Sequence, residues 1–358
     1  MHSEAVGVVD FPTLGDLLDA WTEQHCRVPD GFSRGKPFRK YDWQFWVAAN
    51  HYRVREDAVW VPEQPLLSQA FTYRRSQVVG PQKSGKGPDA ATVVAAEAVG
   101  PVIFGGWAKV GDVYDCARDG DCPCGWTYDY EPGEPKGIRH PSPLIQLTAT
   151  SQDQVDNVYR PLVAMIHLGP LKHTLRPREN FIRIVGQHDD PDVDRIDAVT
   201  SAALSRLGNP ISFALQDESG LYTKQNKMRN VAETQRRGAA AMGGRTMEHT
   251  NPWDPAQESV AQSTWETAAP DVFRFFRQPP PKLRFLDKRQ RRKILEFVYE
   301  GSDHVNLDAV EAECVELIEK DPAQAERFFG GRVVQGGGAW LPGGLWEGAW
   351  AGALVATA

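Results

Sequence analysis

A glycine-rich segment with the spacing G-x-x-x-x-G-K consists of Gly80, Pro81, Gln82, Lys83, Ser84, Gly85, Lys86 and Gly87. It follows an apolar run, Phe71 to Val79, that predicts a strand, and it precedes a helix-compatible run from Ala90 to Ala96. In such a turn the backbone N–H groups and a helix N-terminus converge on phosphate oxygens that the lysine also reaches. We therefore predict a nucleotide phosphate site here.

One position departs from the usual form of this loop. The residue after the lysine is ordinarily Ser or Thr, whose hydroxyl binds Mg²⁺, whereas this chain has Gly87. Ser84 or a water molecule could take that ligand position, or the site could bind nucleotide and turn it over poorly. A glycine-rich turn without a ligand is the structural alternative.

A second signal is an apolar strand, predicted from Ile211 to Gln216, that ends in two acids, Asp217 and Glu218. In phosphate-loop ATPases the aspartate at this point holds Mg²⁺, usually through water, and a following glutamate polarises the attacking water. Two acids at a strand end are commonly just the start of a polar loop. Their combination with Lys86 is what indicates ATP hydrolysis.

Strands and helices alternate along the chain, which predicts an α/β fold with a mainly parallel central sheet. The fold class expected is a P-loop NTPase of the additional-strand, catalytic-glutamate type with a small helical subdomain. Further strands are expected at 144–148, 181–185 and 246–250, with helices from Ser151, at 193–207 and at 224–241. The predicted divisions are an N-terminal helical segment (1–60), the ATPase core (61–278), a helical linker (279–330) and a Gly/Trp-rich tail (331–358), with helices expected at 287–299 and 307–320 in the linker.

Weaker candidates surround the phosphate loop. Thr250 and Asn251 follow a predicted strand and could couple hydrolysis to movement, while Gln44, on a helix that Asp42 could cap, could reach the adenine edge. The alternative for Gln44 is a solvated polar residue on an amphipathic helix. Arg74 or Arg75 is expected near the phosphates.

The formal charge of −7 makes the chain as a whole repel DNA phosphates, so DNA binding would need local basic patches. One basic run lies on a helix predicted near residue 230, where Arg236 or Arg237 could reach a neighbouring subunit's nucleotide. A solvated helix face is the common alternative. The strongest basic run consists of Arg284, Lys288, Arg289, Arg291, Arg292 and Lys293.

Three cysteines, Cys116, Cys122 and Cys124, lie close together in a predicted hairpin insertion near 111–131. They could bind Zn²⁺ if His140 or another group completed a tetrahedron. A surface hairpin with free thiols is an equal alternative. The chain has no run of about 18 uncharged apolar residues and no signal-peptide layout, so we expect a cytoplasmic protein without a membrane span.

Taken in this order, these motifs resemble the tailed-phage terminase large subunit, particularly its actinobacteriophage branch, over the ATPase portion only. The resemblance implies that Gly80, Gly85 and Lys86 bind ATP phosphates, Asp217 holds Mg²⁺ and Glu218 activates water. It also implies that Thr250 and Asn251 couple the ATPase cycle to movement.

The same resemblance implies a motor that drives double-stranded DNA into a capsid. Its partners would be the portal protein, the small terminase subunit and further copies in a ring, in the host cytoplasm and transiently at the capsid portal vertex. Family members normally continue into a nuclease domain. This chain stops where such a domain would begin, so nuclease activity is not expected. The alternatives are a helicase-like DNA-dependent ATPase and a truncated, non-catalytic module that binds nucleotide or DNA.

Overall fold

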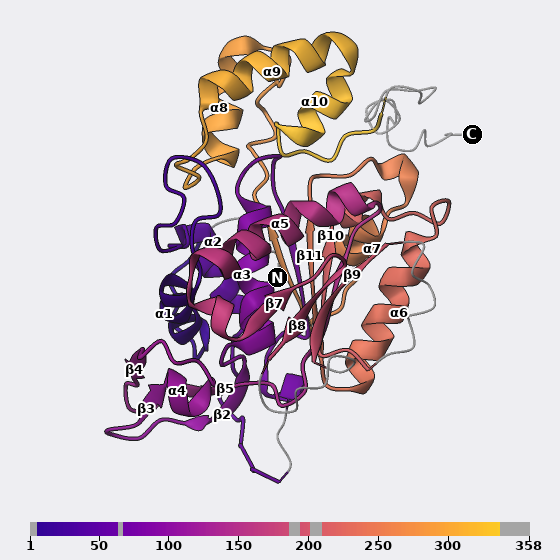
Figure 1. Ribbon diagram of the computed structural model, residues 1–358. Helices are drawn as coiled ribbons and strands as arrows, with labels where there is room; N and C mark the ends of the chain where they lie inside the picture. Colours follow the sequence, from indigo (N-terminus) through magenta and orange to yellow (C-terminus); the bar gives the residue numbers. More distant parts are fainter. Residues whose placement is uncertain (1–5, 64–66, 186–193, 201–209, 337–358) are drawn as a thin grey trace, which may run out of the picture.

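A twisted eight-stranded sheet lies at the centre of the computed structural model, which describes residues 6–63, 67–185, 194–200 and 210–336 (Figure 1). The strands from β12 to β9 run parallel, whereas β8 and β7 pair in antiparallel fashion at one edge. In sheet order the strands are β12 (Val272–Phe276), β1 (Arg75–Val79), β11 (Arg245–Thr250), β10 (Phe213–Asp217), β6 (Leu144–Thr148), β9 (Arg195–Val199), β8 (Phe181–Ile184) and β7 (Leu175–Pro177).

The strand order brings the predicted motifs together. Strand β1 precedes the glycine-rich segment, β10 ends in the acidic pair, and β11 lies between them in the sheet. Because parallel strands present their carboxyl ends at one edge, the residues that follow these three strands converge there. The additional-strand P-loop fold class is thereby confirmed.

Helices cover both faces of the sheet. On one face α3 and α5 contact β6 and β10, and α1 packs on α3; on the other, α6 contacts β10 and β11, and α7 contacts β1. Short 3₁₀ turns lie at 67–70, 170–173, 219–221 and 255–257. The helices are α1 (Gly15–His25), α2 (Asp42–His51), α3 (Lys86–Val99), α5 (Gln152–Leu168), α6 (Met228–Ala241) and α7 (Val260–Glu266).

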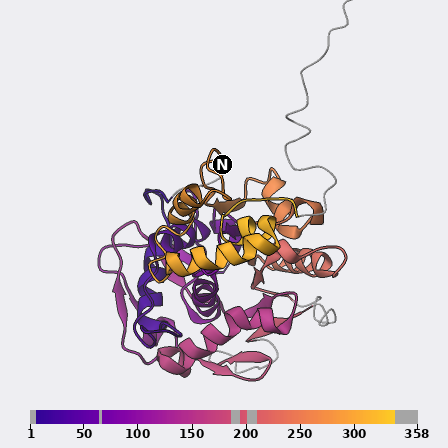
Figure 2. The same ribbon diagram turned by 90° about the horizontal axis from the view of Figure 1, so that it is seen from above.

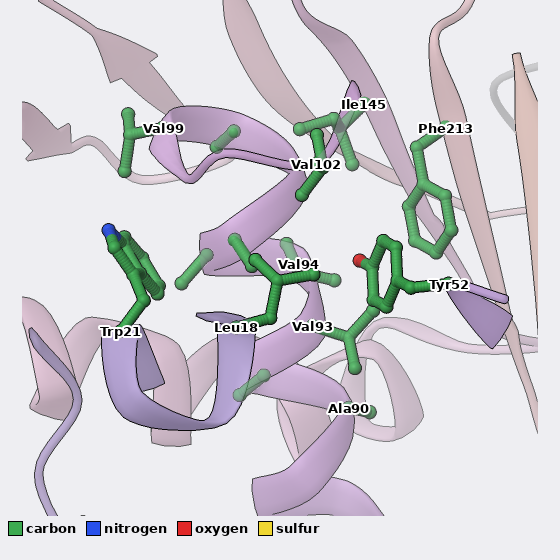
Figure 3. Packing of buried hydrophobic residues seen from close by; sticks show 14 of the residues in the cluster. Leu18, Trp21, Tyr52, Ala90, Val93, Val94, Val99, Val102, Ile145 and Phe213 are labelled. Atoms are coloured by element: carbon green, nitrogen blue, oxygen red, sulfur yellow. The ribbon is translucent and has the colours of Figure 1, made fainter. Parts of the chain in front are cut away.

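The largest apolar cluster lies between α1, α3 and the sheet (Figure 3). Helix α3 is rich in Ala and Val, and these small side chains let it pack closely against neighbours on several sides. Each large side chain removed from water there contributes about 1.5–3 kcal/mol before the cost of ordering it. Figure 3 labels Leu18, Trp21, Tyr52, Ala90, Val93, Val94, Val99, Val102, Ile145 and Phe213 from this cluster.

An insertion between α3 and β6 forms two small antiparallel pairs, which Figure 1 shows at the end of the molecule away from the C-terminal helices. Strand β2 pairs with β5, and β3 pairs with β4. The elements are β2 (Ile103–Trp107), β3 (Val113–Asp115), α4 (Cys116–Asp119), β4 (Thr127–Asp129) and β5 (Pro135–Ile138).

Three helices after the core form a layer of their own over one end of the sheet, drawn in yellow in Figure 2. They pack around a separate apolar cluster that includes Phe285, Leu295 and Phe329. Side chains of Asp287, Asn306 and Asp321 cap their N-termini. These helices are α8 (Lys288–Val298), α9 (Leu307–Lys320) and α10 (Pro322–Phe328), and we call this layer the helical subdomain.

Several sequence predictions need correction. The helix expected at 193–207 is wrong at its start, because β9 occupies Arg195–Val199; residues 201–209 lie outside the described part. The strand expected at 181–185 exists as β8, but it pairs in antiparallel fashion. Strand β1 begins at Arg75, while Phe71 forms an isolated bridge with Val54. Strand β12 and helix α7 were not predicted.

The strands at 144–148 and 245–250 and the helices from Gln152, Lys288 and Leu307 confirm their predictions within a few residues. Most of the expected tail, from residue 337, lies outside the described part. Among the described helices, none combines the length and the apolar character that crossing a bilayer requires.

Candidate active site

The glycine-rich segment forms a tight loop between β1 and α3. Lys83 and Gly85 have positive φ values of 64° and 100°, which turn the chain back onto the helix N-terminus. Gly85 is the N-cap of α3, and a glycine tolerates that conformation without steric cost. The N-terminus of α3 therefore faces the inside of the loop, where its N–H groups favour an anion.

Lys86, the first residue of α3, is buried with its ammonium group turned to the loop. Its Nζ donates to the carbonyl oxygens of Gly80 (2.9 Å) and Pro81 (2.6 Å) and to Oδ1 of Asn251 (3.0 Å). Burial lowers the pKa of Lys86, and the charges of Glu218 and Asp217 oppose that shift. The lysine lies where a phosphate oxygen could replace the loop carbonyls as acceptor.

The acidic pair lies across from Lys86 at the end of β10. Asp217 is 7% exposed, and burial together with the charge of Glu218 raises its pKa to about 8, against the opposing effect of Lys86. A divalent cation at this carboxylate would favour the ionised form. The buried oxygen donor set therefore fits Mg²⁺, and the loop with Lys86 fits the phosphates.

Glu218 has a φ of 54°, a left-handed conformation that is uncommon outside glycine and that marks functional sites. The backbone N–H and the side-chain amide of Asn251 each lie 3.4 Å from an oxygen of its carboxylate. Because Asn251 also accepts from Lys86, one amide side chain connects the phosphate-loop lysine with this carboxylate.

Thr250 fastens the same region from β11. Its Oγ1 accepts from the backbone N–H of Gly220 (2.9 Å) and donates to the carbonyl of Asn251 (2.8 Å). Its own carbonyl accepts from the N–H of Gly80 (3.1 Å). The predicted coupling residues thus contact both the phosphate loop and the turn that carries Glu218; their coupling role stays a prediction.

A cavity of about 580 Å³ opens beside Gly85, a size typical of small-molecule sites. Gln44 lies in its wall and is 1% exposed, with Oε1 accepting from the N–H of Tyr41 (2.9 Å) and Nε2 donating to the carbonyl of Gly85 (3.3 Å). Tyr41 is the N-cap of α2, and Asp42, expected to cap this helix, is its first residue. The predicted adenine contact of Gln44 remains a prediction.

The helical subdomain contacts the outer carbonyls of the loop. Tyr299 donates to the carbonyl of Gln82 (2.7 Å) and Ser302 to that of Ser84 (3.0 Å). His304 Nε2 lies 3.0 Å from the carbonyl of Lys83; since a carbonyl only accepts, this nitrogen carries the proton. We call these three residues the loop clamp.

The clamp extends to the cavity and to α10. The ring of His304 stacks on that of Tyr41 with centroids 5.7 Å apart, and Nδ1 accepts from the Tyr41 hydroxyl at 3.1 Å. The N–H of Gln82 donates to the carbonyl of Phe328 at 2.7 Å. Sequence reasoning missed these residues, because a histidine in a turn between two helices carries no local signal.

Gly87 lies where α3 touches the backbone of α5. A Cβ at this position would lie 2.9 Å from the carbonyl oxygen of Asn157, which is closer than real Cβ contacts. The missing hydroxyl therefore has a steric cause in this fold. Ser84 does not face outward in its place, because its buried Oγ donates to the carbonyl of Pro81 (2.9 Å).

We expect that Gly87→Ser will not raise ATP turnover and will lower the free energy of unfolding by about 1–3 kcal/mol, since a packed helix pair must separate. Gly80→Ala is the matched stability control, because its Cβ would meet only side-chain atoms at 3.6 Å or more. Denaturant unfolding and steady-state turnover measure both effects. A stable and faster Gly87→Ser variant would contradict the steric explanation.

Some predicted arginines have other partners. Arg236 donates through one nitrogen to Glu248 (2.5 Å), Thr264 (3.1 Å) and Gln216 (3.2 Å), so it is engaged within its own chain. Arg237 is exposed on α6. The expectation that Arg74 or Arg75 lies near the phosphates is wrong, because both precede or begin β1, at the end opposite the loop.

The strongest basic run divides into two groups. Arg291 is buried against Glu311 (2.6 Å), and Arg292 pairs with Asp308 and Glu296. The others are exposed, and none forms an ion pair with another residue of the described segments. These exposed residues, the basic face, are Arg284, Lys288, Arg289 and Lys293.

The three predicted thiols do come together, but their imidazole neighbour is His25 of α1. His140 lies apart from this group, where its Nδ1 accepts from the backbone N–H of Ser142 (3.1 Å). No sequence spacing connects His25 with Cys116, which is 91 residues away.

Comparisons with known proteins locate this arrangement among phage terminases. No family model and no curated protein matches the chain. The crystal structure of the HK97 bacteriophage large terminase aligns with a TM-score of 0.59 at 16% identity, covering 89% of this chain and 55% of that one. The Thermus phage P74-26 large terminase ATPase domain gives 0.40 at 12% (76% and 94% covered), and the large terminase of another thermophilic bacteriophage gives 0.35 at 10% (63% and 46%).

The chain thus shares the fold of the HK97 large terminase and spans about half the length of that structure. Identity this low establishes the fold, while activity must be argued from the site.

Proposed function

We propose that this protein is the ATPase of a tailed-phage terminase large subunit, a motor that couples ATP hydrolysis to movement of double-stranded DNA. The observation that carries the proposal is the hydrogen-bonded chain from Lys86 through Asn251 to Glu218 at the carboxyl edge of the sheet. Such a chain connects the group that would contact phosphate with the group that would activate water. The fold shared with the HK97 terminase supports the motor assignment.

In this function the loop from Gly80 to Gly87 and Lys86 hold the triphosphate, and Asp217 would hold Mg²⁺. The bound metal would neutralise charge on the phosphoryl group being transferred. Glu218 takes a proton from the attacking water. Asn251 orients the carboxylate of Glu218, and its contact with Lys86 makes that orientation depend on what the lysine binds. The cavity beside Gly85 accommodates the base, with Gln44 and Tyr41 in its wall.

The helical subdomain is suited to transmit the cycle. The loop clamp holds three successive carbonyls of the phosphate loop, those of Gln82, Lys83 and Ser84. A change in the loop on nucleotide binding therefore acts directly on the connection between α8 and α9. The basic face lies on and just before α8 and provides charges for DNA phosphates despite the net charge of −7.

Partners are proposed on the same basis. A packaging motor of this kind would act in a ring on a capsid portal and would receive DNA with the help of a small terminase subunit, in the host cytoplasm. The exposed Arg237, rather than the internally paired Arg236, is the better placed of the two for a neighbouring subunit's nucleotide.

The test is ATP turnover with and without duplex DNA. We expect stimulation by DNA in the wild type, and we expect the triple variant Lys288→Ala/Arg289→Ala/Lys293→Ala to keep basal turnover and lose most of the stimulation. If all three side chains contact phosphates, the slope of log affinity against log salt should fall by about 2.7. Lys320→Ala, which removes an exposed lysine paired with Glu316 in the same subdomain, is the control.

The outcomes separate the alternatives. An unchanged salt slope in the triple variant would remove the basic face from the DNA site. Strand separation by the purified chain would favour a helicase. Nucleotide binding without hydrolysis, even with DNA present, would indicate a non-catalytic module.

A further inference from the structure

We propose that His25, Cys116, Cys122 and Cys124 form a structural Zn²⁺ site that fastens helix α1 to the insertion between α3 and β6. The ligand atoms of the four residues all lie within 4.8 Å of one another. Two of the separations are short: His25 Nε2 lies 3.2 Å from Cys116 Sγ and 3.3 Å from Cys124 Sγ. The site is distinct from the nucleotide site and independent of the proposed function.

The spacing fits the metal. Zinc bonds of about 2.3 Å to sulfur and 2.0–2.1 Å to nitrogen place tetrahedral ligand atoms roughly 3.5–3.8 Å apart. Four donors within 4.8 Å need only small side-chain adjustments to reach that arrangement. One imidazole and three thiolates form a Cys₃His set, a closed structural type that leaves no open coordination position.

The imidazole is oriented for metal binding. His25 Nδ1 lies 2.8 Å from the carbonyl oxygen of Trp21, one turn earlier in α1. Because a carbonyl only accepts, Nδ1 carries the proton, and the lone pair of Nε2 faces the thiols. A backbone carbonyl that fixes the second nitrogen is the usual support of a zinc-binding histidine. The ring of Trp21 also stacks on His25 at 4.5 Å and holds its plane.

The thiols are presented by a short irregular loop. Cys116 begins α4, and its carbonyl accepts from the N–H groups of both Gly120 and Cys122 at 3.1 Å, which folds the loop back on itself. A Cβ at Gly120 would lie 2.7 Å from the hydroxyl of Tyr114, so the loop passes close to its neighbours. His25, Cys116 and Cys122 are at most 4% exposed, and Cys124 is half-buried.

The insertion needs such a fastening. Strands β3 and β4 have three residues each, and an isolated two-stranded pair of that length is marginal in water. The three thiols belong to this hairpin, and the imidazole belongs to α1, which packs on α3. A metal would therefore tie a weak element to the main core. A disulfide would use only two of the three thiols and would leave His25 without a role.

Elemental analysis of the purified full chain tests the site. We expect about one zinc ion per chain, and a tetrahedral thiolate spectrum after cobalt(II) replaces the zinc. Cys122→Ser and His25→Ala should each weaken zinc binding by roughly 100-fold or more, beyond the 10–100-fold effect of outer partners. His25→Cys should retain the metal as a Cys₄ site. Cys314→Ser, which alters a buried cysteine of α9 outside the cluster, should retain it fully.

Wild-type protein provides the test that does not depend on folding of the variants. Removal of the metal by a chelator should lower Tm, and added zinc should restore it. The proposal is overturned if reduced wild type refolded with excess zinc holds no metal, if the isolated chain contains iron instead, or if mass analysis finds a disulfide among the three thiols. Retained zinc in His25→Ala would remove His25 from the ligand set.

Discussion

Replacing Glu218 by glutamine is expected to lower ATP turnover by about 1,000-fold, within the range lost when a general base is removed. Glutamine has nearly the same shape, and its Oε1 can still accept from the amide of Asn251. It cannot take a proton from water. Nucleotide affinity should therefore change little, because Lys86 and the loop are untouched. Steady-state turnover and calorimetric binding measure the two quantities separately.

The chain offers a matched control for this substitution. Glu258 also has a left-handed backbone, with a φ of 48°, but it is exposed and follows a short turn outside the site. Glu258→Gln repeats the chemistry in the same backbone conformation and should keep wild-type turnover. If Glu218→Gln hydrolysed ATP at the wild-type rate, another group would have to activate the water.

The parts of this site that sequence could predict are those written in contiguous residues. The loop from Gly80 to Gly87 and the pair Asp217 and Glu218 each follow an apolar strand, and parallel strands end at one edge of a sheet. The convergence of these motifs follows from the alternation of strands and helices. The steric reason for Gly87 does not, since it depends on a backbone carbonyl of α5, a helix much later in the chain.

The parts that sequence could not predict depend on packing between distant segments. His304 reaches Lys83 across 221 positions, and its turn has no residue pattern that distinguishes it from a solvent loop. The segment from Arg195 to Val199 has both helical and strand character, and its pairing with β6 decides for the strand. Likewise, the thiols indicated a metal, but only the fold brings α1 and therefore His25 to them.

A buried ion pair connects the cavity wall to the phosphate-loop helix. Lys40 Nζ donates to Asp89 Oδ1 at 2.6 Å and to Thr92 Oγ1 at 2.8 Å, and both charged side chains are at most 3% exposed. Lys40→Met is expected to lower the free energy of unfolding by about 3–5 kcal/mol, because it leaves a buried carboxylate without its cation. Denaturant unfolding measures this loss.

The adjacent residue is the control. Arg39 pairs with Glu23 on the surface, with the two side chains 78% and 42% exposed, so Arg39→Met should cost no more than about 1 kcal/mol. The double variant Lys40→Met/Asp89→Leu should regain most of the stability lost in Lys40→Met, since no buried charge remains. A double variant as unstable as the sum of two single losses would contradict this explanation.

The pH dependence separates an uncompensated charge from lost packing. Burial raises the pKa of Asp89 above its ordinary value even with Lys40 alongside, and in Lys40→Met the opposing cation is gone. A carboxyl whose pKa is higher in the folded than in the unfolded chain destabilises the fold above its folded pKa. That penalty is relieved as the pH falls through the folded pKa toward the unfolded value. The stability deficit of Lys40→Met relative to wild type should therefore be smaller at acidic than at alkaline pH, whereas a deficit from lost packing alone would not change with pH.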